Sequence, residues 1–205
     1  MEAFGNARTL RNDNSSRFGK FVEMSFCDQG RLLGARIDTY LLEKSRLCVH
    51  GEGERNFHVF YQLLCGATDE HMKKFGFDDP SLDGLDGLEL ANEFQYTCQG
   101  GAPELREWND EKAFERTLIA MENIDWTKQK VDKVLSVVAG LLHLGEIQFS
   151  RVERDTGEEM ADIVVEFEKE DRPKTEWFGG IDAHHIFFEG MHKNKDNSYT
   201  IHWGS

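Results

Sequence analysis

The chain has 205 residues, of which 39% are hydrophobic and 30% charged, with a formal net charge of −14 at pH 7. This composition suits a soluble globular protein of one or two domains. The acidic balance argues against nucleic acid or an anionic membrane as a partner, because both need a basic face. No apolar run approaches the roughly 20 residues of a membrane span, and no signal peptide pattern is present. The four cysteines form no Cys-x-x-Cys pair, which favours reduced cytosolic thiols over disulfides or zinc.

The chain begins with a short apolar segment that leads into a polar run. Residues 1–11 carry Ala3, Phe4 and Ala7 at helical spacing, which predicts the end of a helix. Residues 12–17, Asn-Asp-Asn-Ser-Ser-Arg, predict a polar loop before a strand. Amides and hydroxyls can bond phosphate oxygens, and a serine hydroxyl can ligate Mg²⁺. A solvated turn is the alternative, because Asn, Asp and Ser are ordinary turn residues.

Two strands are predicted next. Apolar and polar side chains alternate over residues 18–26 and again over residues 32–42, which is typical of half-buried strands. Between them lies a turn in which Gly30 can take a positive φ. The pair predicts an antiparallel hairpin.

The middle of the chain predicts amphipathic helices over residues 55–66, 68–75, 111–122 and 128–144. Asn109 or Asp110 and then Thr127 are candidate caps of the last two helices. The aromatic stripe of residues 55–66 is attributed to core packing, and His58 to a core or surface position rather than to metal binding.

Residues 76–109 are predicted to be rich in loops. Their acidic cluster, Asp78, Asp79, Asp83 and Asp86, lacks the spacing of a calcium loop, so a solvated loop is favoured.

Residues 151–205 form an acidic tail in which we identify no family. Strands at residues 184–191 and 199–203 predict a hairpin, with its turn at residues 193–197. Four histidines, His184, His185, His192 and His202, raise the alternative of a metal site. Neighbouring strand residues point to opposite faces, so His184 and His185 cannot both join one cluster and the alternative is disfavoured.

The motifs around the polar run resemble a known family. Residues 2–9, Glu-Ala-Phe-Gly-Asn-Ala-Arg-Thr, and residues 12–20, Asn-Asp-Asn-Ser-Ser-Arg-Phe-Gly-Lys, closely resemble the switch I segment of the myosin motor domain. Residues 40–46, Tyr-Leu-Leu-Glu-Lys-Ser-Arg, continue the match. Residues 54–64, Glu-Arg-Asn-Phe-His-Val-Phe-Tyr-Gln-Leu-Leu, and residues 139–149, Ala-Gly-Leu-Leu-His-Leu-Gly-Glu-Ile-Gln-Phe, resemble two helices of that family. The resemblance covers residues 2 to about 149.

The resemblance implies an α+β fold. Its antiparallel hairpin would be part of a larger motor-domain sheet, and its amphipathic helices would form the upper part of the actin-binding cleft. Residues 1–150 are therefore interpreted as a partial motor domain, followed by the tail of residues 151–205 with its hairpin.

The resemblance also assigns roles within switch I, with ATP and Mg²⁺ as cofactors. Asn12 would bond the phosphate chain or the nearby nucleotide, and the Ser16 hydroxyl would ligate Mg²⁺. Ser15 would contact the γ-phosphate and the attacking water, and Arg17 would pair with a glutamate of switch II. Asn14 matches the nucleotide-binding pattern, but no separate role is assigned to it, and Asp13 occupies a variable position. The implied partner is the actin filament, and the implied location is the cytoplasm and cytoskeleton.

The chain lacks a Gly-x-x-x-x-Gly-Lys-(Ser/Thr) phosphate cradle and an Asp-x-x-Gly-Phe-Glu switch II, so Arg17 is expected to have no partner. We therefore interpret it as a partial myosin head of an actin-based, ATP-driven motor that is not catalytically competent alone. A non-enzymatic myosin-derived binding protein or truncated gene product is one alternative. An acidic α+β domain with a phosphate-binding loop is another. Because the hairpin has open edges and an uncovered apolar face, the isolated chain is expected to be unstable or to self-associate unless the tail covers that face.

Overall fold

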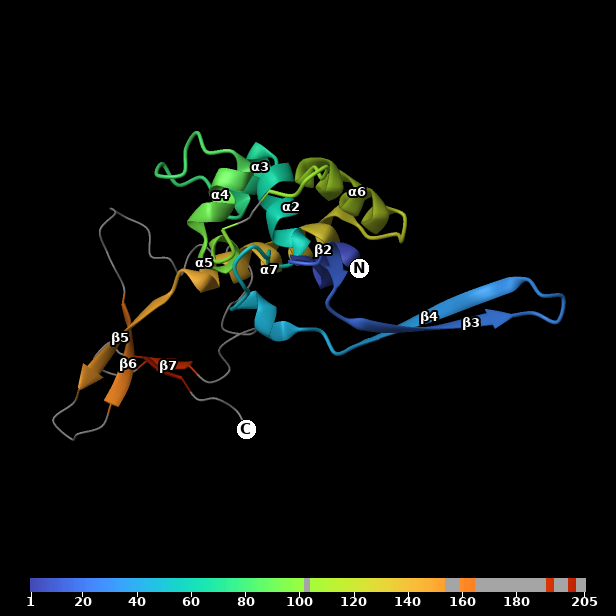
Figure 1. Cartoon of the computed structure of the whole chain (residues 1–205), viewed down its shortest axis with the longest axis horizontal. Helices are drawn as coiled ribbons and strands as arrows, with labels where there is room; N and C mark the ends of the chain where they lie inside the picture. The colour runs from blue at the N-terminus through green and yellow to red at the C-terminus, as the bar shows by residue number, and fades with distance from the viewer. Residues whose placement is uncertain (102–103, 154–158, 165–190, 194–198, 202–205) are drawn as a thin grey trace.

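A computed structural model describes residues 1–101, 104–153, 159–164, 191–193 and 199–201 of the chain. Within these residues the fold is α+β, as predicted, with a helical body and two-stranded antiparallel sheets (Figure 1). The helices are α1 (Glu2–Gly5), α2 (His58–Gly66), α3 (Asp69–Lys74), α4 (Gly87–Glu93), α5 (Gln95–Cys98), α6 (Asp110–Glu122) and α7 (Lys128–Gly145), with a 3₁₀ segment η1 (Lys44–Leu47). The strands are β1 (Asn6–Thr9), β2 (Asn12–Ser16), β3 (Gly19–Phe26), β4 (Leu32–Tyr40), β5 (Gln148–Glu153), β6 (Glu159–Val164), β7 (Met191–Lys193) and β8 (Tyr199–Ile201).

Helix α2 is the centre of the buried core. All of its residues from His58 to Leu64 are buried, and it packs against α1, α4, α6 and α7. The apolar stripe predicted for this helix is confirmed as core packing by Phe57, Phe60, Tyr61 and Leu64. A buried side chain of this kind contributes about 1.5–3 kcal/mol, so α2 supplies a large share of the stability of the body.

The N-terminal part of the predicted helix over residues 55–66 is extended. The Arg55 amide donates to the Arg8 carbonyl at 3.1 Å, and Phe57 forms an isolated bridge with Ala7. These residues pair with β1 before the helix begins at His58. Tertiary pairing therefore overrides the helical spacing at this end.

Side-chain caps mark the starts of four helices. Asn109 accepts a hydrogen bond from the Lys112 amide and Thr127 accepts one from the Lys130 amide, as predicted for α6 and α7. Thr68 and Asp86 complete capping boxes at α3 and α4. The prediction that residues 76–109 are rich in loops agrees with most of the described residues of this segment, which also contains the short helices α4 and α5. Asp86 and Glu89, three positions apart, are the capping-box signal that identifies α4.

The N-terminal segment differs from the prediction. Helix α1 ends at Gly5, and residues Asn6–Thr9 form β1, which pairs with β2 in an antiparallel hairpin. The polar run is thus mainly a strand rather than a loop. Thr9 and Asn12 close the turn through two hydrogen bonds of 3.2 Å. Strand preference depends strongly on context, and here the pairing with β1 determines the conformation.

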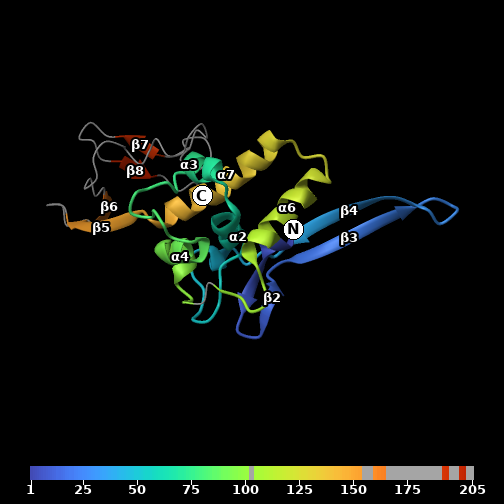
Figure 2. The same ribbon diagram turned by 90° about the horizontal axis from the view of Figure 1, so that it is seen from above.

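The hairpin formed by β3 and β4 projects from the helical body, as Figures 1 and 2 show. Its antiparallel register places Val22 opposite Ile37 and Met24 opposite Ala35, so one face is apolar. Gly30 has a φ of +74° in the connecting turn. The alternating pattern and the hairpin are confirmed, but the expected half-burial is not, because every residue from Lys20 to Phe26 is exposed.

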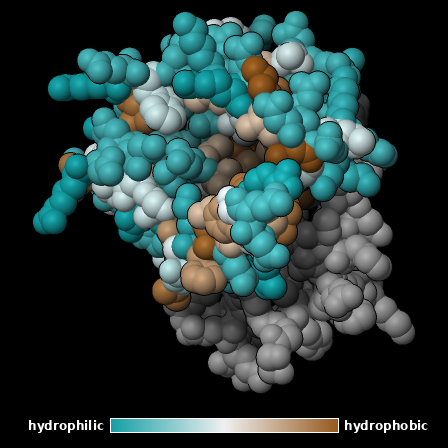
Figure 3. Space-filling model, turned by 90° about the vertical axis from the view of Figure 1, so that its right-hand side faces the viewer, coloured by the Kyte–Doolittle hydropathy of each residue, from teal (hydrophilic) through white to brown (hydrophobic). Residues whose placement is uncertain are grey.

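Figure 3 views the molecule from the side on which this hairpin projects, and hydrophobic side chains are visible there among hydrophilic ones. The large hydrophobic residues exposed on β3 and β4 are Phe21, Val22, Met24, Phe26, Leu32, Leu33, Ile37 and Tyr40. The hairpin therefore carries an apolar face that the described part of the chain does not cover.

Short antiparallel pairs lie at the start of the tail and within it. Strand β5 begins at Gln148, before the tail, and pairs with β6 in a hairpin that the sequence pattern did not predict. Strand β7 pairs with β8 in an antiparallel hairpin, as predicted, but β7 extends to Lys193, which was predicted to lie in the turn. Most of the predicted strand at residues 184–191 lies outside the described residues, as do His184, His185 and His202.

Two expectations from the sequence concern membrane-spanning helices and the state of the cysteines. Among the helices that the structure describes, none has both the length and the apolar character needed to cross a membrane. All four cysteines, Cys27, Cys48, Cys65 and Cys98, are free thiols.

Candidate functional site

Strand β2 carries the polar side chains that the sequence analysis identified. It pairs with β1, with Asn6 opposite Ser16 and Ala7 opposite Ser15. Ser16 is exposed and Ser15 is half-buried. Because successive strand residues project to opposite faces, Ser15 and Ser16 leave the strand in different directions. The structure thus places the predicted residues on one strand but divides them between its two faces.

Arg17 connects Ser15 to a carboxylate. Its Nη1 donates to Ser15 Oγ at 3.1 Å, and its Nε donates to Glu43 Oε2 at 2.6 Å. The expectation that Arg17 has no partner in this chain is therefore wrong, because Glu43 supplies one. A guanidinium has five N–H donors, so the Nη2 donors remain for a second carboxylate. The Ser15 hydroxyl accepts from Arg17 and can turn its own proton toward an incoming acceptor.

Glu43 belongs to a row of alternating charges that runs from Arg17 through Glu43 and Arg46 to Glu54. Its Oε2 also accepts from Arg46 Nε at 2.8 Å, and Arg46 Nη1 donates to Glu54 Oε2 at 3.0 Å. Partial burial raises the pKa of the Glu43 carboxyl, but hydrogen bonds from Arg17 and Arg46 outweigh it and hold this pKa below its ordinary value. Glu43 is therefore ionised at neutral pH and keeps Arg17 in place.

The Ser16 hydroxyl is arranged as an acceptor. Its proton is donated to the Phe18 carbonyl at 3.0 Å, so its oxygen lone pairs are available to a cation. Among the described residues no group of three or more His, Cys, Asp or Glu side chains could hold a metal ion. A cation at Ser16 would therefore take most of its ligands from water and phosphate oxygens. This coordination is usual for Mg²⁺, so the residue fits the ion that the resemblance implies.

The two asparagines of β2 have different surroundings. Asn12 is exposed, and its Oδ1 accepts from the Asn14 amide at 2.9 Å, which leaves its Nδ2 donor for a ligand. Asn14 instead faces the body, where its Oδ1 accepts from Asn6 Nδ2 at 3.1 Å and lies 3.1 Å from His58 Nε2.

Three residues that support the strand were missed at the sequence level. Asn6 and Glu43 lie in the motifs that flank the polar run, but no spacing rule connects them to Asn14 and Arg17. His58 is buried, which agrees with the core position considered for it, yet its contact with Asn14 depends on the fold.

A buried ion pair lies behind His58. Arg55 Nη2 donates to both Asp110 carboxylate oxygens at 3.1 Å, and both side chains are buried. The Arg55 guanidinium also lies over the Tyr61 ring, 3.7 Å from its centroid. Trp108 Nε1 donates to Asp110 Oδ1 at 3.1 Å. The Arg55–Asp110 ion pair thus connects the residues just before α2 with the first residue of α6.

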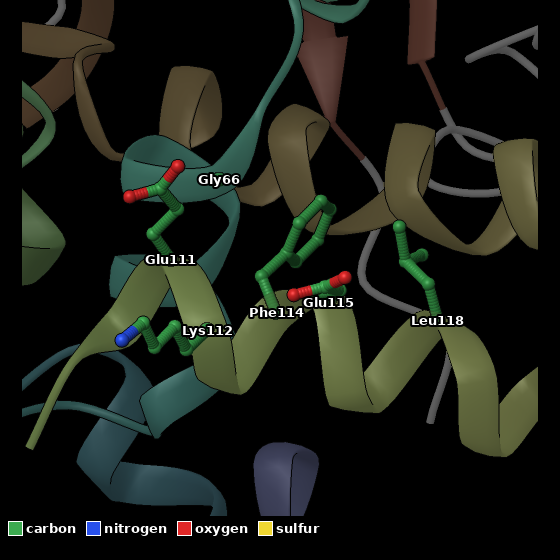
Figure 4. Close-up of a pocket in the computed structure, with 6 residues that line it drawn as sticks. All are labelled: Gly66, Glu111, Lys112, Phe114, Glu115 and Leu118. Atoms are coloured by element: carbon green, nitrogen blue, oxygen red, sulfur yellow. The ribbon is translucent and has the colours of Figure 1, made fainter.

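A hollow of about 440 Å³ lies between the end of α2 and one side of α6 (Figure 4). Its lining consists of Gly66, Glu111, Lys112, Phe114, Glu115 and Leu118. No residue of β2 is among them. The hollow is therefore distinct from the polar strand, and we assign no ligand to it.

Comparisons with known proteins identify the family of the chain. A family model described as the myosin head (motor domain) matches residues 1–170. The chain is 44% identical to Myosin-6 of Arabidopsis thaliana over 153 residues, which is 75% of this chain and 9% of that protein. It is 41% identical to Unconventional myosin-Ic-A of Xenopus laevis over 150 residues, which is 73% of this chain and 14% of that protein. It is 42% identical to Myosin-17 of Arabidopsis thaliana over 169 residues, which is 82% of this chain and 10% of that protein.

The α+β fold and these matches define a piece of a motor domain, and the chain belongs to the myosin head family. It spans only a small part of the relatives it matches, between 6% and 14% of their length. The family match extends to residue 170, about 20 residues beyond the end assigned from motifs, so the first part of the tail also belongs to it.

Proposed function

We propose that β2 and the adjoining Arg17 are the switch I element of a myosin head, and that they contribute to binding the γ-phosphate and Mg²⁺ of ATP. The observation that carries the proposal is the arrangement of Ser15, Ser16 and Arg17. Arg17 donates to Ser15, and Ser16 donates to the Phe18 carbonyl. One hydroxyl can therefore donate to an anion while the other presents lone pairs to a cation.

Each residue has one task in this proposal. Asn12 donates to the phosphate chain, Ser15 orients the γ-phosphate and the attacking water, and Ser16 contributes one oxygen to Mg²⁺. When bound, Mg²⁺ would neutralise charge on the transferring phosphoryl group. Arg17 keeps Glu43 and uses its remaining donors for a glutamate of switch II, which closes the site and excludes water.

The wider role follows from family membership as a proposal. The complete protein is an actin-based, ATP-driven motor located in the cytoplasm and cytoskeleton, with the actin filament as its partner. Residues 1–150 contribute switch I, two strands of the central sheet and helices of the upper cleft. The tail of residues 151–205 follows, and its residues 151–170 still lie within the family match. This chain alone is not catalytically competent, because its sequence contains neither the phosphate cradle nor switch II. The competing reading of an unrelated acidic domain conflicts with the family match.

Nucleotide binding is tested on the full chain by NMR with Mg²⁺ and the slowly hydrolysed analogue ATPγS. We expect binding in the range of about 1 mM, which corresponds to only about −4 kcal/mol, since one of several phosphate-binding elements is present. Amide shifts should change at residues 12–17. Ser15→Ala and Ser16→Ala should reduce these changes, whereas the matched control Asp13→Ala should keep them. Equal behaviour of all three variants would contradict the proposal.

Hydrolysis is tested in a chimera. Residues 1–149 replace the matching segment in the motor of the Myosin-I heavy chain of Dictyostelium discoideum, which is 42% identical over 149 residues. We expect Mg²⁺-dependent ATPase activity that falls by about 10²-fold or more with Arg17→Ala, because loss of site closure misplaces the reacting groups and a small misplacement has this magnitude. An unchanged rate would exclude Arg17 from site closure.

The hairpin supports a second role. Its bare apolar face fits a protein-binding surface. In a complete motor the remaining strands of the sheet would pair with its edges, and another layer of the domain would cover the face. Sedimentation velocity of the unmodified chain and of a variant with charged residues on this face tests this role.

A further inference from the structure

A partly buried polar contact connects the proposed switch I strand to the start of α2. Asn14 Oδ1 accepts a hydrogen bond from Asn6 Nδ2 at 3.1 Å and lies 3.1 Å from His58 Nε2. Asn6 is 5% exposed and His58 is 1% exposed. The Asn14 carboxamide is therefore held from two sides by groups that belong to the body of the protein.

The contact determines which nitrogen of His58 carries its proton. A carboxamide oxygen only accepts hydrogen bonds, so Nε2 must be the donor. Among the described residues His58 Nδ1 has no hydrogen-bond partner. A bare lone pair suits this position better than an unpaired N–H would, so the neutral Nε2–H tautomer is favoured. Burial, together with the positive charge of Arg55, lowers the pKa of His58 to about 3.

The imidazole ring of His58 is held in place by the residues packed against it. It stacks on Trp108 with 5.1 Å between ring centroids and 27° between planes. Trp108 Nε1 donates to Asp110 Oδ1, and Asp110 is paired with Arg55. His58 is the first residue of α2, so its backbone is also held by that helix. The ring has little freedom to follow Asn14 if the strand moves.

We propose that His58 is a positioning residue for the phosphate-sensing strand, whose Nε2–H bond to Asn14 fixes β2 and thereby presents Ser15, Ser16 and Arg17 in one conformation before any ligand binds. The inference deepens the proposed function and rests on it. It also gives Asn14 a role: its side chain anchors the strand to the body rather than contacting nucleotide.

The first measurement is made on the full, unmodified chain without nucleotide. Ring ¹⁵N shifts should show a protonated Nε2 and a bare Nδ1 for His58 from pH 8 down to pH 4. An Nδ1–H tautomer, or titration near the ordinary His pKa of 6.5, would overturn the proposal.

The second measurement is amide hydrogen exchange in matched variants. His58→Phe keeps a stacking ring but removes the donor, and exchange of residues 13–17 should become about tenfold faster, as expected for loss of a buried hydrogen bond. His58→Gln can place its amide Nε2 near the position of the imidazole Nε2 and should largely restore the slow exchange. His58→Asn has a shorter side chain and should not. Core amides of α7 report global stability, and an equal acceleration there would show a merely structural role and overturn the proposal.

A variant of Asn14, the acceptor of the hydrogen bond from His58, makes the test independent of how well the His58 variants fold. Asn14→Ala should accelerate the same amides at least as much as His58→Phe does, because it also removes the hydrogen bond from Asn6, and the double variant His58→Phe with Asn14→Ala should be no faster than Asn14→Ala alone. Additive effects would overturn the proposal.

The ligand titration separates this inference from the proposed function. If the amide shifts of the unmodified chain respond to Mg²⁺ and ATPγS, His58→Phe should weaken this response several-fold and His58→Gln should restore it. If the unmodified chain shows no response while the exchange results hold, the nucleotide-binding role of β2 fails and the anchoring of the strand by His58 stands.

Discussion

Arg17 and Glu43 lie 26 positions apart and clamp the base of the projecting hairpin. Their side chains meet at 2.6 Å, and the Glu43 amide donates to the Arg17 carbonyl at 2.9 Å. Because β3 and β4 lie between them, the orientation of the hairpin and the position of Arg17 are set by the same contact. A change at either residue should therefore affect both stability and the proposed site.

We expect Glu43→Gln to lower the free energy of unfolding by about 1–3 kcal/mol at pH 7, because it weakens hydrogen bonds to two arginines, one of them buried. The pKa of Glu43 is lowered by folding, so its stabilising effect is present above the ordinary value of 4.5 and is lost as pH falls through the lower folded-state pKa. Urea unfolding at a series of pH values measures this difference. The control is Asp38→Asn in the exposed Arg36–Asp38 pair, which should cost about 0.2–1 kcal/mol. Equal effects at both pairs would contradict the prediction.

The buried pair of Arg55 and Asp110 should be far more sensitive. Asp110→Asn leaves the Arg55 guanidinium buried without a compensating charge, and we expect a loss of about 3–5 kcal/mol in the free energy of unfolding. Glu111→Gln, at the exposed neighbouring position, removes a charge of the same sign from the same helix end and should cost less than about 1 kcal/mol. Urea denaturation followed by circular dichroism distinguishes them. A small effect at Asp110 would mean that the pair is not buried in solution.

Gly87 allows a close approach between α4 and α2. A Cβ added there would lie 2.3 Å from the Cys65 Cα, so Gly87→Ala must push the two helices apart. We expect a destabilisation of about 1–3 kcal/mol, the usual cost of overpacking. The control is Gly34→Ala on β4, where no atom lies within 4 Å of the added Cβ. Thermal unfolding of both variants tests the prediction, and a neutral Gly87→Ala would contradict the packing of α4 on α2.

The uncovered apolar face of the hairpin should drive self-association. Sedimentation velocity of the unmodified chain should show dimers and larger species as concentration rises, because association removes the exposed apolar face from water. Val22→Lys combined with Ile37→Glu places opposite charges on a directly opposed pair. This double variant should keep the hairpin and shift association to at least about tenfold higher concentration.

Ile119→Glu is the control for this measurement, since Ile119 is an exposed hydrophobic residue on α6, outside the hairpin. It should leave the association unchanged. A monodisperse monomer of the unmodified chain, with a cooperative melt, would contradict the prediction.

Local signals in the sequence determined most of the secondary structure. The period of two over residues 18–26 and 32–42, the stripe of α2 and the caps Asn109 and Thr127 act over a few residues, so each could be recognised without knowledge of the fold. The family resemblance came from contiguous motifs for the same reason. The missed capping box at Asp86 shows that one such local signal was present and overlooked.

Tertiary structure decided what these elements contact. The polar run became a strand because β1 lies beside it, and residues 55–57 became extended because they pair with the same segment. Glu43 contacts Arg17 although the whole β3–β4 hairpin separates them in the sequence. His58, at the start of α2, contacts Asn14 on β2. The alternating pattern predicted a strand with one buried face, but whether that face is covered depends on neighbouring segments. Contacts between distant parts of a chain have no fixed spacing, so only the folded structure determines them.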